Sequence, residues 1–171
     1  MVLASAGAAR RAPRKPAWVR ATAMKSEPTM FAGRDQVNPQ AARDCAAELY
    51  KKAGITDPRR ELDCAEIYVP FSWFEPMWME NLGFAPDGQG WKMTYEGATA
   101  LDGDLPVNAS GGVLSSNPIG ASGMLRFAES ALQVRGMAGE HQVEGARLAL
   151  GHAYGGGSQF FAMWIVGAEQ A

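Results

Sequence analysis

The stretch that decides the fold of this chain is Asn108–Gly123, NASGGVLSSNPIGASG, which is rich in Gly and Ser. It runs directly into the segment Met124–Arg135, whose apolar spacing predicts a helix that ends at Gly136. A Gly and Ser loop before a helix offers unpaired N–H groups and a favourable dipole to an anion or a carbonyl oxygen. Such loops are about as often plain structural turns, so the loop alone leaves both interpretations open.

Two apolar strands are predicted after this helix, over Arg147–Ala153 and Gln159–Val166, with a broad glycine turn between them. Strand ends carry sites in α/β folds, so His152 is a candidate general base and Tyr154 a candidate acid or enolate-orienting donor. The alternative is that His152 is a satisfied core histidine and Tyr154 a packed ring.

Upstream of the loop, Leu62–Phe71 predicts a buried strand, followed by a helix that Ser72 caps and Gly83 ends. Tyr68 is near the carboxyl end of this strand. In a buried strand Glu66 needs a partner, so it is either a functional carboxylate or half of a structural hydrogen-bond network, and the structural interpretation is favoured.

The rest of the chain completes an α/β pattern. Strands are predicted over Val2–Ala6 and Ala17–Ala23, a helix from Pro39 to Gly54, and an irregular strand or hairpin around Trp91–Tyr95. Aromatic residues at helical spacing usually mark core or an interface, and an apolar acyl or ring-binding cavity is the alternative. This applies to Trp73, Phe74, Trp78 and Trp91.

Composition narrows the class of protein. The 171 residues suit one soluble domain, and 16 basic against 18 acidic residues give no field that favours nucleic acid, while no apolar stretch is long enough for membrane insertion. Cys45 and Cys64 have neither metal-binding nor disulfide spacing, so they predict buried hydrophobes, no metal, and a reducing cytoplasm.

Three stretches, in this order and spacing, resemble the carboxy-terminal half of the thiolase superfamily. Glu66–Phe71 is similar to the family's E-x-N-E-A-F or H-D-x-F strand, and Asn108–Gly123 to its N-x-x-G-G…G-H-P-x-G-A-S-G loop. His152–Gly157 is similar to the closing C-x-G-G-G or H-N-x-G-x-G-G turn. The resemblance implies a mixed sheet of about five strands covered by helices. It also implies that residues 1–24 are the last strand and connection of a missing amino-terminal half, and that residues 25–171 are the carboxy-terminal domain.

The chain departs from these motifs at three positions. Asn117 replaces the motif His, Tyr68 replaces an Asn or His, and Ala153 replaces the closing Cys. This pattern is similar to the lipid-transfer or sterol-carrier branch, in which some members are aldolases that use tyrosines. The resemblance implies a coenzyme A thioester as substrate and no covalently bound cofactor. The catalytic candidates are Tyr68, Asn117, His152 and Tyr154, and the coenzyme A contacts are Ser116, Gly120, Ala121, Ser122, Gly155 and Gly156.

The expected function is therefore to make or break a C–C bond next to a coenzyme A thioester, by a retro-aldol or Claisen step. The expected partners are a thiolase-like amino-terminal half or a second copy of the chain, and an OB-fold, zinc-ribbon protein. Tyr154 is the first choice of proton carrier, with a phenolate favoured by the N–H groups of Gly155–Gly157, and Tyr68 is the second. Asn117 is expected to polarise the thioester oxygen. The alternative is an acyl-CoA- or lipid-binding protein without turnover.

Overall fold

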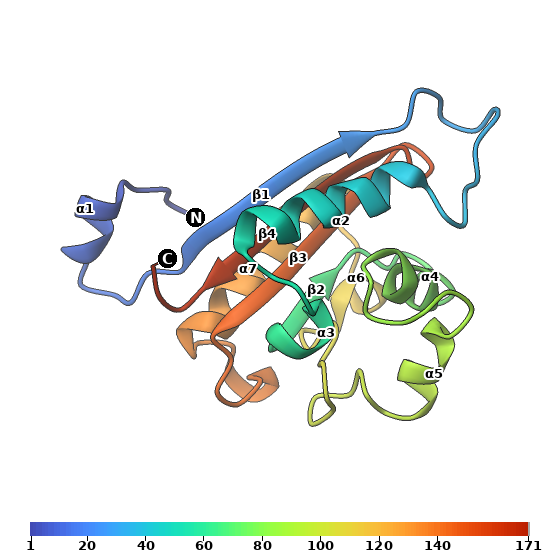
Figure 1. The fold of residues 1–171 in the computed structure, drawn as a ribbon. Helices are drawn as coiled ribbons and strands as arrows, with labels where there is room; N and C mark the ends of the chain where they lie inside the picture. The colour runs from blue at the N-terminus through green and yellow to red at the C-terminus, as the bar shows by residue number, and fades with distance from the viewer. Residues whose placement is uncertain (171) are drawn as a thin grey trace.

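A computed structural model describes residues 1–170, and its centre is a four-stranded mixed sheet with helices on both faces (Figure 1). The strand order is β1-β4-β3-β2. The strands are β1 (Trp18–Ser26), β2 (Cys64–Ile67), β3 (Leu148–Gly155) and β4 (Phe160–Gly167). β3 pairs parallel with β2 and antiparallel with β4, and β4 pairs antiparallel with β1.

The sheet has four strands rather than the predicted five. Next to β2, an isolated parallel bridge joins Ala65 and Val107, and it is too short to form a fifth strand. Two backbone hydrogen bonds flank this bridge, from Ala65 to Pro106 and from Asn108 to Ala65. Pairing stops there because Asn108 adopts a left-handed conformation with φ of 53°, which turns the chain away from the sheet.

Three helices cover the sheet. α2 (Gln40–Ala53) packs on β1 and β4 and ends at Gly54, whose φ of 73° gives the left-handed helix stop that was predicted. α4 (Phe74–Asn81) contributes to the same hydrophobic core. α7 (Ser122–Arg135) packs on β3 from the other face. Along β3 the side chains therefore alternate between the α2 and α4 side and the α7 side.

The remaining elements are short. They are α1 (Ala6–Arg10), α3 (Pro58–Glu61), α5 (Gly90–Tyr95), α6 (Gly112–Ser115) and the 3₁₀ turns η1 (Ile119–Ala121) and η2 (Gly139–His141).

Three local predictions are corrected by the structure. Residues 2–6 form no strand, because Ser5 instead caps α1 by accepting a hydrogen bond from the Ala8 N–H. The predicted strand around Trp91 is α5, in which Met93 is buried while Tyr95 points to solvent. Ser72 does not cap α4, which begins at Phe74.

The predicted division between residues 24 and 25 falls inside β1, whose pairing with β4 runs from Trp18 to Ser26. Both cysteines are free and buried, as predicted. Of the four tryptophan and phenylalanine positions considered above, Phe74 and Trp78 are in the core, whereas Trp73 and Trp91 are more than half exposed. Within residues 1–170, no helix combines the length and apolar character required to cross a membrane.

Candidate active site

Tyr68, Asn117 and Tyr154 come together at one edge of the sheet. Tyr68 directly follows β2, and Tyr154 lies near the end of the parallel neighbour β3, so the two side chains emerge at the same edge. Their rings meet edge to face, with centroids 5.1 Å apart. Asn117 Nδ2 lies 3.4 Å from Tyr68 Oη and donates a hydrogen bond to it. The tertiary structure thus unites side chains from three separate segments.

Two backbone contacts hold Tyr68 in this position. Its N–H donates to the carbonyl of His152 at 3.1 Å, which extends the β2–β3 pairing by one residue. Its carbonyl accepts a hydrogen bond from Trp78 Nε1 at 2.9 Å. The centroid of the same indole lies 5.1 Å from that of the Tyr154 ring, so Trp78 contacts both tyrosines.

Asn117 comes from the exposed connection between α6 and α7, and its amide is oriented by Ser122. The Ser122 hydroxyl donates to Asn117 Oδ1 at 2.7 Å. Because that bond occupies the amide oxygen, the amide NH₂ group faces Tyr68. The first residue of α7 therefore decides which end of the Asn117 amide reaches the site.

Tyr154 is protonated near neutral pH in this environment. Burial raises the pKa of Tyr154, and the neighbouring Tyr68 adds to the rise. This is the reverse of the phenolate that the glycine turn predicted. The Tyr154 hydroxyl consequently keeps its proton in the resting protein.

His152 lies in the core and does not join these side chains. It is 0% exposed, its ring lies 5.0 Å from Trp78, and neither ring nitrogen has a hydrogen-bond partner among residues 1–170. Burial lowers the pKa of His152 to about 3. Its predicted placement as an accessible base is corrected, because β3 directs this side chain inward. It is a core histidine, though not the satisfied one of the alternative interpretation.

The predicted coenzyme A contacts divide into two groups. Ser116, Gly120 and Ala121 are exposed on the loop before α7, and Gly155 and Gly156 are partly exposed beside Tyr154. Ser122, in contrast, is 1% exposed, and its hydroxyl is hydrogen-bonded to Asn117. Its hydroxyl orients a site residue instead of facing a ligand.

Glu66 is half of a buried hydrogen-bond network, as the favoured interpretation of the sequence had it. Its Oε2 lies 2.7 Å from Arg126 Nη1 and accepts a hydrogen bond from the Ser110 hydroxyl, and its Oε1 accepts one from the Ser110 N–H. Burial raises the pKa of Glu66, and the Arg126 guanidinium opposes that rise. Sequence reasoning missed Arg126 and Ser110. The available signal was a charged residue one helical turn after Ser122, on the inward face of α7.

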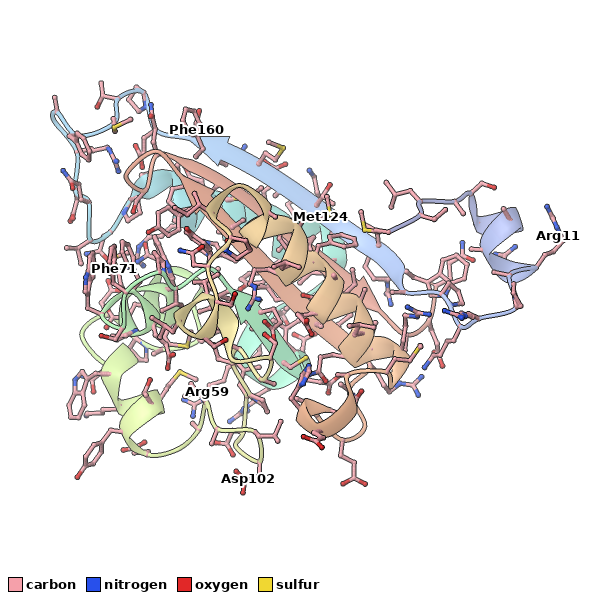
Figure 2. The ribbon with its side chains drawn as sticks, turned by 180° about the vertical axis from the view of Figure 1, so that it is seen from behind. Arg11, Arg59, Phe71, Asp102, Met124 and Phe160 are labelled. Carbon is pink, nitrogen blue, oxygen red and sulfur yellow. The ribbon has the colours of Figure 1, made fainter. Side chains whose placement is uncertain are left out.

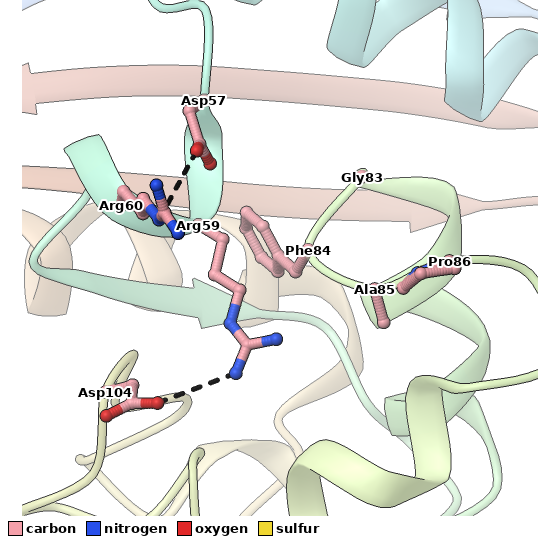
Figure 3. A pocket seen from close by; sticks show the side chains of 8 residues that line it. All are labelled: Asp57, Arg59, Arg60, Gly83, Phe84, Ala85, Pro86 and Asp104. Carbon is pink, nitrogen blue, oxygen red and sulfur yellow. Dashed lines mark ion pairs between the residues drawn. The ribbon is translucent and has the colours of Figure 1, made fainter.

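A separate surface hollow of about 1030 Å³ lies beside α3 and is lined by none of these site residues. Figure 3 shows its charged side chains, which form two ion pairs, Arg59 with Asp104 at 3.5 Å and Arg60 with Asp57 at 3.7 Å. In the part of the chain that the structure describes, no group of three or more His, Cys, Asp or Glu side chains could hold a metal ion.

Comparison with known proteins agrees with this architecture. The family model described as "Thiolase C-terminal domain-like" matches residues 23–168. An acetyl-CoA acetyltransferase of Methanothermobacter thermautotrophicus is 35% identical over 91% of this chain and 41% of its own length. Human sterol carrier protein 2 is 36% identical over 79% of this chain and 24% of its own length. The chain thus spans less than half of these relatives.

Solved structures show the same fold. The "Ltp2-ChsH2(DUF35) aldolase" superposes with a TM-score of 0.84, at 24% identity, over 97% of this chain and 43% of the other. A monomeric SCP2-thiolase like protein type 1 from Mycobacterium smegmatis gives a TM-score of 0.65 at 20% identity, over 91% of this chain and 30% of the other. With the family model covering most of its residues, the chain belongs to the thiolase C-terminal domain-like family.

Proposed function

We propose that this chain is the carboxy-terminal part of a thiolase-like enzyme that makes or breaks a C–C bond next to a coenzyme A thioester. The observation that carries the proposal is the meeting of Asn117, Tyr68 and Tyr154, with the Asn117 amide 3.4 Å from the Tyr68 oxygen. Two phenols and an amide donor are enough for acid–base chemistry on a thioester without a covalent acyl-enzyme.

In the retro-aldol direction each group has one role. Tyr68 takes the proton of the substrate's β-hydroxyl group at its oxygen as it passes its own proton toward Tyr154, and the C–C bond breaks to release a carbonyl product and a thioester enolate. Asn117 donates to the thioester oxygen, where negative charge develops. Tyr154 then gives its proton to the enolate carbon. Proton transfer between the adjacent tyrosines restores the starting state, so the step needs no other reactant.

The retro-aldol direction is preferred to Claisen chemistry because the chain lacks the motif His and Cys, and Claisen chemistry on an acyl-CoA needs groups that activate a thiol and take the α-proton. Ala153 stands where the motif has Cys. Burial raises the pKa of Cys45 to about 11 and of Cys64 to about 12, and the thiolate is the nucleophilic form.

We propose that the apolar surface around the start of α7 is covered by a thiolase-like amino-terminal half, on another chain or in a longer protein. Ile119 is 79% exposed and Met124 56% exposed, and Phe160 at the start of β4 is also exposed. Figure 2 labels Met124 and Phe160 on this side of the molecule. A patch of this kind usually marks an interface. A second copy of the chain is the other occupant, and an OB-fold, zinc-ribbon partner follows from the resemblance only.

The bound substrate would be an acyl-CoA. We place its thioester against Asn117. The rest of the coenzyme A would lie along Ser116, Gly120, Ala121, Gly155 and Gly156, whose small side chains let a ligand approach the backbone.

The second candidate function is acyl-CoA or lipid binding without turnover. The observation in its favour is the loss of the motif His and Cys at Asn117 and Ala153, which removes two groups that can accept a proton.

The two functions differ in turnover. The purified chain, alone and coexpressed with a thiolase-like amino-terminal half, is mixed with a β-hydroxyacyl-CoA. Calorimetry measures binding, and chromatography measures the carbonyl product and the shortened acyl-CoA. Product formation by the reconstituted protein is the expected result. Binding with no product in either preparation would establish the non-catalytic function instead.

A further inference from the structure

The loop that carries Asn117 is exposed along its length but is held at both ends by one buried carboxylate. Residues 114–121 are all exposed. The loop leaves the sheet edge at Ser110 and returns to the core at α7. An exposed loop of this kind makes few apolar contacts that would fix its conformation.

Glu66, Ser110 and Arg126 form the contact between the two loop ends, and we call these three residues the Glu66 clamp. Ser110 donates to Glu66 from its N–H at 3.1 Å and from its hydroxyl at 2.8 Å. Arg126 Nη1 donates to Glu66 at 2.7 Å and to the Ser110 hydroxyl at 3.1 Å. The side chains of Arg126 and Glu66 are 5% and 1% exposed, so water does not weaken this pair.

We propose that Arg126 is a positioning residue, which closes the base of the Asn117 loop through Glu66 and Ser110 and thereby sets the distance between Asn117 and Tyr68. The inference rests on the proposed function for its catalytic consequence. Its structural part stands on the clamp alone.

The clamp connects both partners of the Asn117–Tyr68 contact. On one side, Glu66 lies two residues before Tyr68 on the same extended segment. On the other side, Arg126 lies four residues after Ser122, on the same face of α7, and Ser122 orients Asn117. A shift of α7 relative to β2 therefore changes the position of the Asn117 amide against the tyrosine.

Fold stabilisation alone does not explain the buried ion pair between Arg126 and Glu66. Removing two charges from water costs about as much as their attraction returns, so a buried ion pair is weak evidence for stability. Apolar side chains of similar volume are often as stable in such places. What the clamp adds is directional geometry from three hydrogen-bonding side chains.

The test uses the full chain with the double variant Glu66→Gln/Arg126→Met, which removes both charges together and leaves no unpaired ion. Gln133→Met is the matched control, because Gln133 is also a buried polar residue of α7 but bonds to His141 and Val143 at the far end. Hydrogen exchange of the hydrogen-bonded loop amides, Gly111 and Ala121, and the side-chain NH₂ resonances of Asn117 are measured in each protein. Where the reconstituted enzyme turns over, kcat and KM are measured too.

In the double variant we expect loop exchange at least about tenfold faster than in the wild type, and loss of the distinct Asn117 NH₂ resonances. We expect kcat to fall at least about tenfold with KM changed less than about threefold. Gln133→Met should leave the loop exchange and the Asn117 resonances unchanged. Wild-type loop exchange and wild-type Asn117 resonances in a folded double variant would overturn the proposal.

If the double variant does not fold, Ser110→Ala gives the same test, since it removes the hydroxyl and keeps the ion pair. Faster loop exchange in Ser110→Ala supports the clamp, and unchanged exchange overturns it. A reconstituted wild type without turnover would defeat the proposed function, while the exchange and resonance measurements would still decide the clamp.

Discussion

Tyr68 and Tyr154 meet edge to face with ring centroids 5.1 Å apart, although 85 residues separate them in the chain (positions 69 to 153). The contact arises because β2 and β3 are parallel neighbours with Ile67 opposite His152. It places two phenols within reach of one bound molecule.

The first prediction concerns these phenols. Tyr68→Phe and Tyr154→Phe should each lower kcat of the reconstituted enzyme by about a hundredfold or more, with acyl-CoA binding largely kept, because each removes one proton-transfer group. Steady-state kinetics and calorimetry measure both quantities. Tyr95→Phe is the control, since Tyr95 is 83% exposed on α5. Near-normal turnover in both site variants, with activity abolished in a folded His152→Ala protein, would show that the imidazole is the base.

Asn117→Ala should lower kcat by about a hundredfold, as for loss of an oxyanion donor. Ser122→Ala should give a smaller loss, because the Asn117 amide then remains but is free to rotate its oxygen toward Tyr68. Steady-state kinetics on the two variants tests the order of these effects. A Ser122→Ala loss as large as that of Asn117→Ala would argue against the orienting role.

The buried His152 predicts a pH-dependent stability. Its folded pKa of about 3 lies below the ordinary 6.5, so the unfolded chain binds more protons between these values, and this stability is lost as pH falls through that window. Between about pH 7.5 and about pH 5, the wild type should lose about 2 kcal/mol more than His152→Phe. Urea denaturation at both pH values measures the difference. His141→Gln, at a partly exposed histidine, should keep the wild-type dependence, and an equal loss in His152→Phe would refute the assignment.

The Trp164 indole packs directly over Gly151, in space that a side chain at position 151 would fill. A Cβ atom at Gly151 would lie 1.9 Å from Trp164 Nε1, so the indole occupies the space that any larger residue needs. Gly151→Ala should destabilise the fold by about 2–3 kcal/mol through overpacking, and Trp164→Leu in the same chain should relieve most of the clash. Thermal unfolding of the single and double variants checks this. Strictly additive effects would contradict it.

The two cysteines should be inert in the folded protein. Burial raises both thiol pKa values, so the thiolate population at neutral pH is very small and the sulfur atoms are out of reach. A thiol-specific reagent at about pH 7.5 should modify neither Cys45 nor Cys64 until denaturant is added. Mass spectrometry counts the modified thiols, and labelling of Cys64 in the native state would reopen the question of a thiol nucleophile.

The sequence by itself determined the family and the α/β pattern, and it singled out three side chains that lie together in the structure. Helix stops such as Gly54 and strands such as β3 follow from local spacing and backbone preference, which adjacent residues express on their own. The motif order also identified Tyr68, Asn117 and Tyr154, because their positions are marked by glycines and by a strand end.

Only the tertiary structure decided the surroundings of those residues. The partner of Glu66 is Arg126, 60 positions later, and that pairing depends on how α7 packs against the sheet. The inward direction of His152 and the protonated state of Tyr154 depend on which neighbours exclude water from them. Strand register, helix rotation and burial are properties of the assembled core. A linear pattern of residue types carries local preferences, whereas these contacts join segments that only the folded chain brings together.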